Sequence, residues 1–201
     1  YIIVSSEEEA GLYISELFKD KIKCYSETVY VKIDNVWSCN KKMIEAYLGI
    51  QIRRSKIVKK NRNRIVPYAQ NIQTSRNIIK SVIDNALINN TDNMFYDKLH
   101  ETTRGKLCFL NGVLDIPTKT FIKWSDIQEN KIYTTVCIGR NYNPERDEKC
   151  IQEIKDRIFY AVFKDDTDKL LHLLSRAVAG EVEDKIWGKY IGNRNSSKGL
   201  I

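Results

Sequence analysis

The stretch K-L-C-F-L-N-G-V-L-D-I-P-T-K-T-F-I-K-W, from Lys106 to Trp124, decides the fold class of this chain. Short runs rich in apolar residues alternate in it with two sets of turn residues, Asn111-Gly112 and Pro117-Thr118-Lys119. Asn-Gly favours a two-residue hairpin turn, and proline fixes one backbone angle of a wider turn. The pattern therefore predicts short strands joined by tight turns in the middle of the chain.

Segments before and after this stretch have the spacing of helices, because apolar residues recur at every third or fourth position. Helices are predicted for residues 7–20, 41–48, 75–87 and about 91–100, and for two segments between Pro144 and Gly180, the second capped by Asp165 or Asp166. Since the helices flank a β-rich middle, the expected class is α+β.

Three further segments have the composition of strands. Residues 22–39 are rich in β-branched and aromatic side chains, with a break at Asp34-Asn35 that predicts a hairpin ending at Trp37. Tyr133 to Gly139 and Ile186 to Gly192 are similar in composition, so each is expected to form a strand. Trp37, Trp124 and Trp187 are expected to anchor a core or an interface.

The composition is that of a soluble globular protein, with 42% apolar and 29% charged residues among 201. No apolar run approaches the roughly 20 residues that span a bilayer, and the chain starts at Tyr1 without a signal-peptide pattern. We therefore expect a fragment of a longer intracellular protein, located in the cytoplasm or at a viral replication site, with no membrane contact.

The five cysteines are scattered and never spaced C-x-x-C, so with only two histidines they form no recognisable metal site. They are Cys24, Cys39, Cys108, Cys137 and Cys150. This pattern favours thiols in a reducing compartment over a disulfide framework.

The positive charge of the chain is concentrated in one segment. The net charge is +7, and Gln51 to Arg64 (Q-I-R-R-S-K-I-V-K-K-N-R-N-R) holds seven basic residues and no acidic one. The seven are Arg53, Arg54, Lys56, Lys59, Lys60, Arg62 and Arg64. A basic cluster fits a polyanionic partner such as DNA, because each neutralised phosphate releases counterions. The alternative is a solvated surface loop.

The last residues, I-G-N-R-N-S-S-K-G-L, approximate the phosphate-binding loop G-x-x-x-x-G-K-[ST]. Gly192 and Lys198 match, while Ser197 replaces the second glycine and Gly199 stands where a Mg²⁺-binding hydroxyl belongs. The predicted nucleotide-binding residues are Gly192, Asn193, Arg194, Asn195, Ser196, Ser197, Lys198 and Gly199. Because a strand is predicted directly before them, the context favours a nucleotide loop.

The order of several segments resembles the domain that precedes the superfamily 3 helicase module in poxvirus-type primase–helicases of large DNA viruses and related phages and plasmids. The segments are L-N-G-V-L-D-I-P-T-K-T-F-I-K-W, Y-T-T-V-C-I-G-R-N-Y-N-P and L-L-H-L-L-S-R-A-V-A-G, followed by the strand and loop. E-E-A-G-L-Y-I-S-E-L and V-Y-V-K-I-D-N-V-W are similar to the opening helix and strand of that family.

The resemblance implies that the parent protein is an ATP- and Mg²⁺-dependent DNA helicase, homo-hexameric and often preceded by a primase domain. It implies an α+β region in residues 1–105, a hairpin and helical part in 106–185, and the start of an AAA+-like motor in 186–201, with Lys198 as the Walker A lysine. The expected role of these residues is DNA contact and ring assembly.

We expect the 201 residues alone to bind no cofactor productively and to hydrolyse no ATP, because phosphoryl transfer also needs downstream carboxylates and an arginine finger. The alternative function is a stand-alone nucleic-acid-binding or protein-interaction module without a motor.

Overall fold

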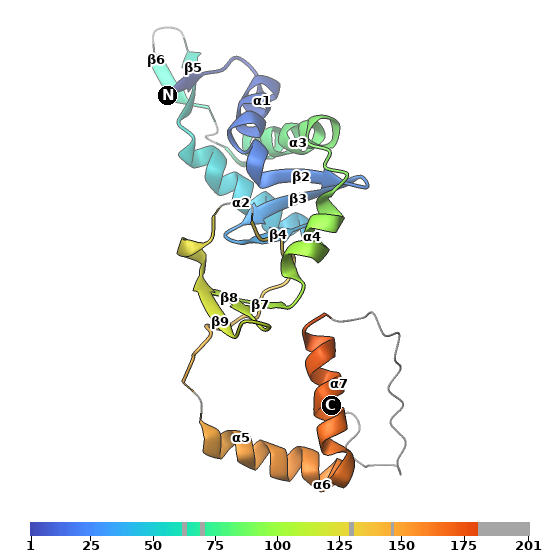
Figure 1. Ribbon diagram of the computed structural model, residues 1–201. Coiled ribbons are helices and arrows are strands. Elements are labelled where there is room, and N and C mark those ends of the chain that lie inside the picture. The colour runs from blue at the N-terminus through green and yellow to red at the C-terminus, as the bar shows by residue number, and fades with distance from the viewer. Residues whose placement is uncertain (62–63, 69–70, 129–130, 146, 181–201) are drawn as a thin grey trace. The chain divides into compact units, whose positions relative to one another are not determined.

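The computed structural model describes residues 1–61, 64–68, 71–128, 131–145 and 147–180, which form two compact units (Figure 1). Unit 1 comprises Tyr1–Thr102 and Glu129–Val136, and unit 2 comprises Thr103–Gln128 and Cys137–Ile201. Both units contain helices and strands, so the α+β class is confirmed. The strand and nucleotide loop predicted for residues 186–201 lie outside the described residues. The predicted division into residues 1–105, 106–185 and 186–201 stays a prediction.

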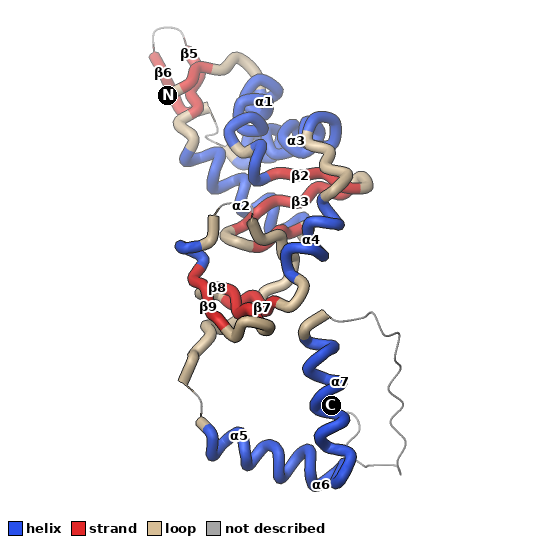
Figure 2. Tube along the Cα trace, in the orientation of Figure 1, coloured by secondary structure: helices blue, strands red, loops and turns tan. Residues whose placement is uncertain are grey.

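Unit 1 contains two three-stranded sheets and the helices α1 to α4 (Figure 2). Its elements are β1 (Ile2–Ile3), α1 (Glu7–Leu17), β2 (Ile22–Tyr25), β3 (Thr28–Ile33), β4 (Val36–Ser38), α2 (Lys41–Arg54), β5 (Ile57–Asn61), β6 (Arg64–Pro67), α3 (Ile72–Asn89) and α4 (Phe95–Thr103). One sheet has the order β1-β5-β6, with β1 parallel to β5 and β6 antiparallel to it. The other is the antiparallel meander β2-β3-β4.

The meander has one turn more than the sequence predicts. The expected break at Asp34-Asn35 joins β3 to β4, and Asp34 has a φ of 54°. A second two-residue turn, Ser26-Glu27, joins β2 to β3, with φ of 47° and 63°. Two residues with positive φ favour glycine or asparagine, so a Ser-Glu pair gives no turn signal in the sequence.

Side-chain caps set the helix starts of unit 1. Ser6 accepts a hydrogen bond from the Glu9 amide at 3.1 Å, and Asn71 accepts one from the Thr74 amide at 2.7 Å. Helix α2 begins at the predicted residue but continues to Arg54, because Ile52 is buried and adds a further apolar turn. Three glutamates in the first turn of α1 also complement the helix dipole.

The main core of unit 1 lies where α1, α2 and α3 meet the meander. Its fully buried members are Ala10, Ile14, Val31, Leu48, Ile78, Val82 and Ala86. Helices α1 and α3 approach so closely that a Cβ on Gly11 would clash with the hydroxyl of Ser81. This packing holds α3 in place, and α2 also packs against α3.

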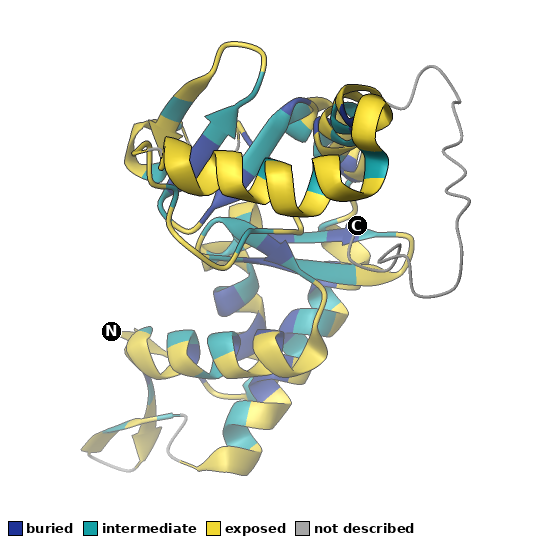
Figure 3. Cartoon of the chain, turned by 90° about the horizontal axis from the view of Figure 1, so that it is seen from below, coloured by how far each residue is buried: buried dark blue, intermediate teal, exposed yellow. Residues whose placement is uncertain are grey.

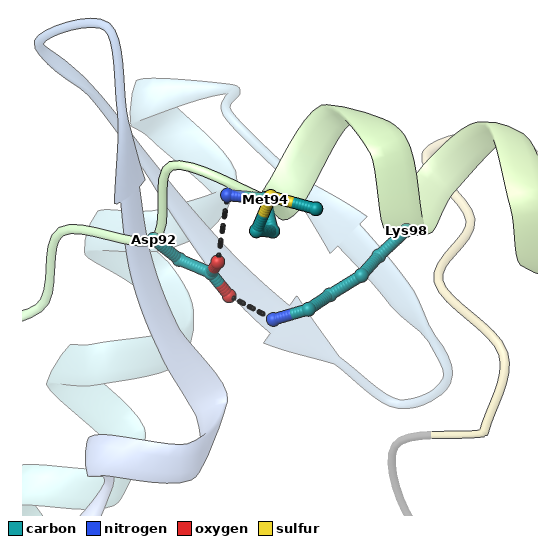
Figure 4. Close-up of polar contacts among 3 residues, drawn as sticks. All are labelled: Asp92, Met94 and Lys98. Carbon is teal, nitrogen blue, oxygen red and sulfur yellow. Dashed lines mark hydrogen bonds and ion pairs between the residues drawn. The ribbon is translucent and has the colours of Figure 1, made fainter.

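A second, aromatic cluster joins three separate segments of unit 1. Trp37 is stacked on Tyr133 with ring centroids 5.4 Å apart, and Phe95 meets both rings edge-on. Asp92, before α4, accepts hydrogen bonds from the Met94 amide and from the Lys98 ammonium group (Figure 4). Trp37 is therefore a core residue, as expected, and Tyr133 reaches this core from a distant part of the chain.

Unit 2 begins with the predicted central sheet. Its elements are β7 (Lys106–Phe109), β8 (Gly112–Asp115), β9 (Thr120–Lys123), α5 (Glu148–Ile154), a π-helical segment (Lys155–Tyr160), α6 (Ala161–Phe163) and α7 (Thr167–Val178). The three strands form an antiparallel sheet in the order β7-β8-β9. None of the residues from Glu148 to Phe163 is buried (Figure 3).

The first turn of this sheet differs from the prediction. Its two central residues are Leu110 and Asn111, while Gly112 already belongs to β8. Gly112 is instead required by close packing, because a Cβ there would clash with the Ile122 carbonyl oxygen. The Asn111 amide bonds to both backbone groups of Tyr142. These contacts, and not turn geometry, explain the Asn-Gly pair.

Two other predictions for unit 2 are also corrected. Residues 133–139 form no strand, and only Ile138 makes an isolated bridge, to Phe109. Asp166 stands at the start of α7, but its carboxylate pairs with Lys169 instead of capping the helix. The end of α7 is as predicted, because Gly180 follows it with a φ of 75°. Within the described ranges, no helix is both long and apolar enough to cross a bilayer.

Candidate nucleic-acid interface

In its described residues, the basic segment of residues 51–64 is a helix end followed by β5 and the start of its antiparallel partner β6 (Figure 2), which together we call the β5–β6 hairpin. Arg53 and Arg54 occupy the last turn of α2, where the helix dipole favours cations. Lys56 has a φ of 54° in the turn that leads into β5. Lys59 and Lys60 then lie on β5, and Arg64 begins β6. Arg62 lies outside the described residues.

The hairpin divides its cations between two faces. Side chains alternate along a strand, and directly paired residues share a face. Lys59 pairs with Val66 and Asn61 with Arg64, so Lys59 and Arg64 lie on one face. Lys60 pairs with Ile65 on the other face. A rigid partner lying against one face of the hairpin would therefore meet only part of the predicted set.

Tyr68 lies under one of these cations. The Lys59 Nζ lies 5.6 Å from the centre of the Tyr68 ring, within the range of a cation–π contact. Burial raises the pKa of the Tyr68 hydroxyl, and the nearby charges of Glu7 and Glu9 raise it further. The phenol thus stays neutral at physiological pH, and its ring lies beneath the Lys59 ammonium group.

The described cations of this segment are open to solvent and to anions. All six are exposed, and no ion pair within the described part of the chain involves any of them: Arg53, Arg54, Lys56, Lys59, Lys60 and Arg64. Exposed cations without an ion pair can neutralise DNA phosphates, which releases the small cations condensed on the DNA. The segment therefore has the electrostatics of a phosphate-binding surface.

A second basic feature lies beside the hairpin, in a groove between α2 and α3 that we call the α2–α3 groove. Its volume is about 750 Å³, and five cations line it: Lys41, Lys42, Arg53, Arg76 and Lys80. The only carboxylate among its described lining residues is Glu45. Arg53 thus belongs to both surfaces. The other four were missed in the sequence because they come from two helices separated along the chain.

The floor of the α2–α3 groove is formed by two small residues and two isoleucines. Ala46 and Gly49 leave space on α2, opposite Ile79 and Ile83 of α3. A Cβ placed on Gly49 would meet the Ile79 side chain at 3.9 Å, an ordinary contact. Close packing of α2 against α3 therefore does not require glycine at position 49, and the groove has room above it. The i, i+4 pair Arg76 and Lys80 is the one sequence signal that could have pointed to it.

The predicted nucleotide-binding residues, Gly192 to Gly199, lie outside the described residues, so their geometry stays a prediction. Elsewhere in the described ranges, no three His, Cys, Asp or Glu side chains gather as ligands for a metal ion. None of the five cysteines forms a disulfide.

Comparison with known families identifies the domain. A family model described as "D5 N terminal like" matches residues 11–160, well over half of the chain. The match includes the basic segment, the α2–α3 groove and the central sheet, and it ends before the predicted nucleotide loop. No curated protein matches the chain.

Proposed function

Since the chain belongs to the D5 N-terminal-like family, the N-terminal region of poxvirus D5-type primase-helicases, we propose that it supplies DNA contact to a helicase of that type. The contact surface is the end of α2 together with the β5–β6 hairpin. In the longer protein this surface would guide DNA to an ATP- and Mg²⁺-dependent motor, in a ring of identical subunits.

One observation carries this proposal: the six described cations between Arg53 and Arg64 are exposed and have no ion pair within the described part of the chain. The rest of the chain has 26 basic and 26 acidic residues, so the excess charge belongs to this segment. The segment has no acidic residue to repel phosphates. Binding driven by such a surface is sequence-independent and releases counterions.

The test is the salt dependence of DNA binding, measured by fluorescence anisotropy with duplex and single-stranded probes. Seven phosphate contacts would give a log–log slope of about −6 on duplex. A shallower slope is expected, because the hairpin presents its cations on two faces. Replacing Arg53, Arg54, Lys59 and Lys60 by glutamine should flatten the slope and weaken binding.

The matched control, set against the two-charge variant Lys59→Gln with Lys60→Gln, removes two charges of the same kind elsewhere. Lys119 and Lys123 are exposed residues of unit 2, and their replacement by glutamine should leave the slope nearly unchanged. Equal effects of the two sets, or unchanged binding after the hairpin substitutions, would refute DNA contact through the hairpin.

The runner-up is a module that binds a protein and has no motor. The apolar floor of the α2–α3 groove favours this second function, because apolar side chains of a protein would be buried against it, whereas a charged phosphate backbone would not. The gene sequence beyond Ile201 separates the two: a strand ending in carboxylates some tens of residues downstream supports the motor.

A further inference from the structure

The rim of the α2–α3 groove carries an unusual excess of positive charge for its position. Lys41 and Lys42 occupy the first turn of α2, where the helix dipole disfavours cations, and no acidic residue accompanies them. Arg76 and Lys80 line the same groove from α3. No ion pair within the described residues neutralises these four side chains. Cations in the first turn of a helix destabilise it, and such locally unfavourable residues are expected at functional sites.

The groove is long and has an apolar floor. It extends from Lys41 to Arg53 along α2, which corresponds to about 18 Å of helix. Ile79 and Ile83 form the floor on α3, and Ile72 at one end is 72% exposed. An occupant that covers this surface must therefore be elongated and present its own apolar side chains.

These features favour a peptide over a nucleic acid. No aromatic side chain is among the described lining residues, so bases have no ring on which to stack. A phosphate backbone would contact the cations but leave the apolar floor uncovered. An amphipathic helix laid in a groove satisfies both parts, with apolar anchors on the floor and acids at the rim.

We propose that the α2–α3 groove binds an acidic amphipathic helix of a partner protein, about three turns long. Its apolar residues, spaced i, i+3/i+4 and i+7, would cover Ala46, Gly49, Ile79 and Ile83. Its Asp and Glu side chains would pair with the rim lysines and arginines. This interaction is additional to DNA contact by the hairpin and does not depend on it.

The test uses a defined probe: an 18-residue synthetic peptide of Leu, Ala and Glu, with Leu at helical spacing on one face and a fluorescent label. A second peptide of the same composition, scrambled so that no apolar face forms, measures the contribution of charge alone. The groove should bind the amphipathic peptide at least about tenfold more tightly than the scrambled one.

Two sets of variants test the two parts of the groove. Lys41→Glu with Lys80→Glu reverses the rim charge and should weaken peptide binding about tenfold or more. Ala46→Glu places a carboxylate on the floor and should abolish binding, while Ala46→Gln retains part of it. Ala46 is exposed, and both replacements form helices well, so the thermal midpoint should stay within a few degrees of the wild type.

The outcomes separate this inference from the proposed function. Equal binding of the two peptides, or full binding by Ala46→Glu, would show that the groove attracts any acidic chain and would overturn the inference. If the groove variants instead abolish duplex DNA binding and leave the peptide bound, the groove is a nucleic-acid site. Loss of DNA binding in the Lys59→Gln, Lys60→Gln variant, which leaves the shared Arg53 in place, supports both sites as assigned when peptide binding stays intact.

Discussion

The ammonium group of Lys98 lies 2.7 Å from the Oδ2 atom of Asp92 and bridges α4 to the turn before it (Figure 4). The same carboxylate accepts the Met94 amide through Oδ1 at 3.1 Å. Lys98 also lies 5.6 Å from the centre of the Tyr133 ring. One carboxylate therefore fixes the start of α4 and the cation that covers the aromatic cluster.

Replacement of Asp92 should separate its two contributions. Asp92→Asn keeps an oxygen for the Met94 amide but loses the charge that pairs with Lys98, whereas Asp92→Ala loses both. We expect the alanine variant to lose about 1–2 kcal/mol of unfolding free energy, and the asparagine variant to lose less. Urea unfolding followed by tryptophan fluorescence measures both, and equal losses would mean that the hydrogen bond to the Met94 amide contributes nothing.

The central sheet should lose stability in acid, because protonation of the Asp115 carboxylate weakens its hydrogen bonds. Its hydrogen bonds from the Thr118 amide and hydroxyl, at 3.0 and 2.8 Å, lower the pKa of Asp115 below 3.8. Because the folded-state pKa is depressed, the stabilisation is present above pH 3.8 and is lost as the pH falls through the lowered value. The wild type should thus be more stable than Asp115→Asn at neutral pH, and the difference should vanish in stronger acid.

Urea titrations of both proteins across this pH range test the effect, with the exposed Asp84→Asn as control. A difference between wild type and Asp115→Asn that does not change with pH would contradict it.

Gly112 should tolerate no side chain. A Cβ there would clash with the Ile122 carbonyl oxygen and lie 3.0 Å from the Lys123 Cα, both backbone atoms that cannot move without distorting β9. We expect Gly112→Ala to cost about 3 kcal/mol or more. Gly139→Ala is the matched control, because nothing lies within 4 Å of its added Cβ. Similar thermal midpoints for the two variants would show that β8 and β9 are not packed as described.

The cysteines provide a probe of each unit. Cys24 is buried in unit 1 and Cys108 in unit 2, whereas Cys39 and Cys150 are exposed. A maleimide should label the two exposed cysteines first, and Cys24 and Cys108 only when their units open. Burial raises the pKa of Cys137, so its smaller thiolate fraction should make it slower than the exposed pair. Mass spectrometry of digests at increasing urea measures each site, and rapid labelling of Cys24 in native buffer would contradict its burial.

The parts of the fold that depend on local spacing could be predicted from the sequence. Helices α1 and α3 follow from their apolar periodicity, and the β8–β9 turn follows from Pro117 and the capping oxygen of Asp115. The Ser26-Glu27 turn could not be predicted, because strand pairing imposes positive φ on two residues that do not favour it. Propensity also failed at residues 133–139, since Tyr133 belongs to the core of unit 1 and Ile138 to unit 2.

The candidate site also has one part that the sequence predicts and one part that it does not. The hairpin cations are neighbours in sequence, so their charge is visible without a structure. The groove cations line one groove only because α2, which carries Lys41 and Lys42, packs against α3, which carries Arg76 and Lys80. That juxtaposition depends on long-range packing, which no local pattern encodes.

Unit 1 is discontinuous, and this has a consequence for synthesis on the ribosome. The Trp37 indole packs against Tyr133, and the Trp37 amide donates to the Thr134 carbonyl at 2.7 Å. Both partners are translated only after Thr103–Gln128 of unit 2. At about 5–20 residues per second, the nascent chain waits on the order of seconds for them. During that interval the indole is incompletely covered, which makes the emerging polypeptide a target for chaperones that bind exposed aromatic surface.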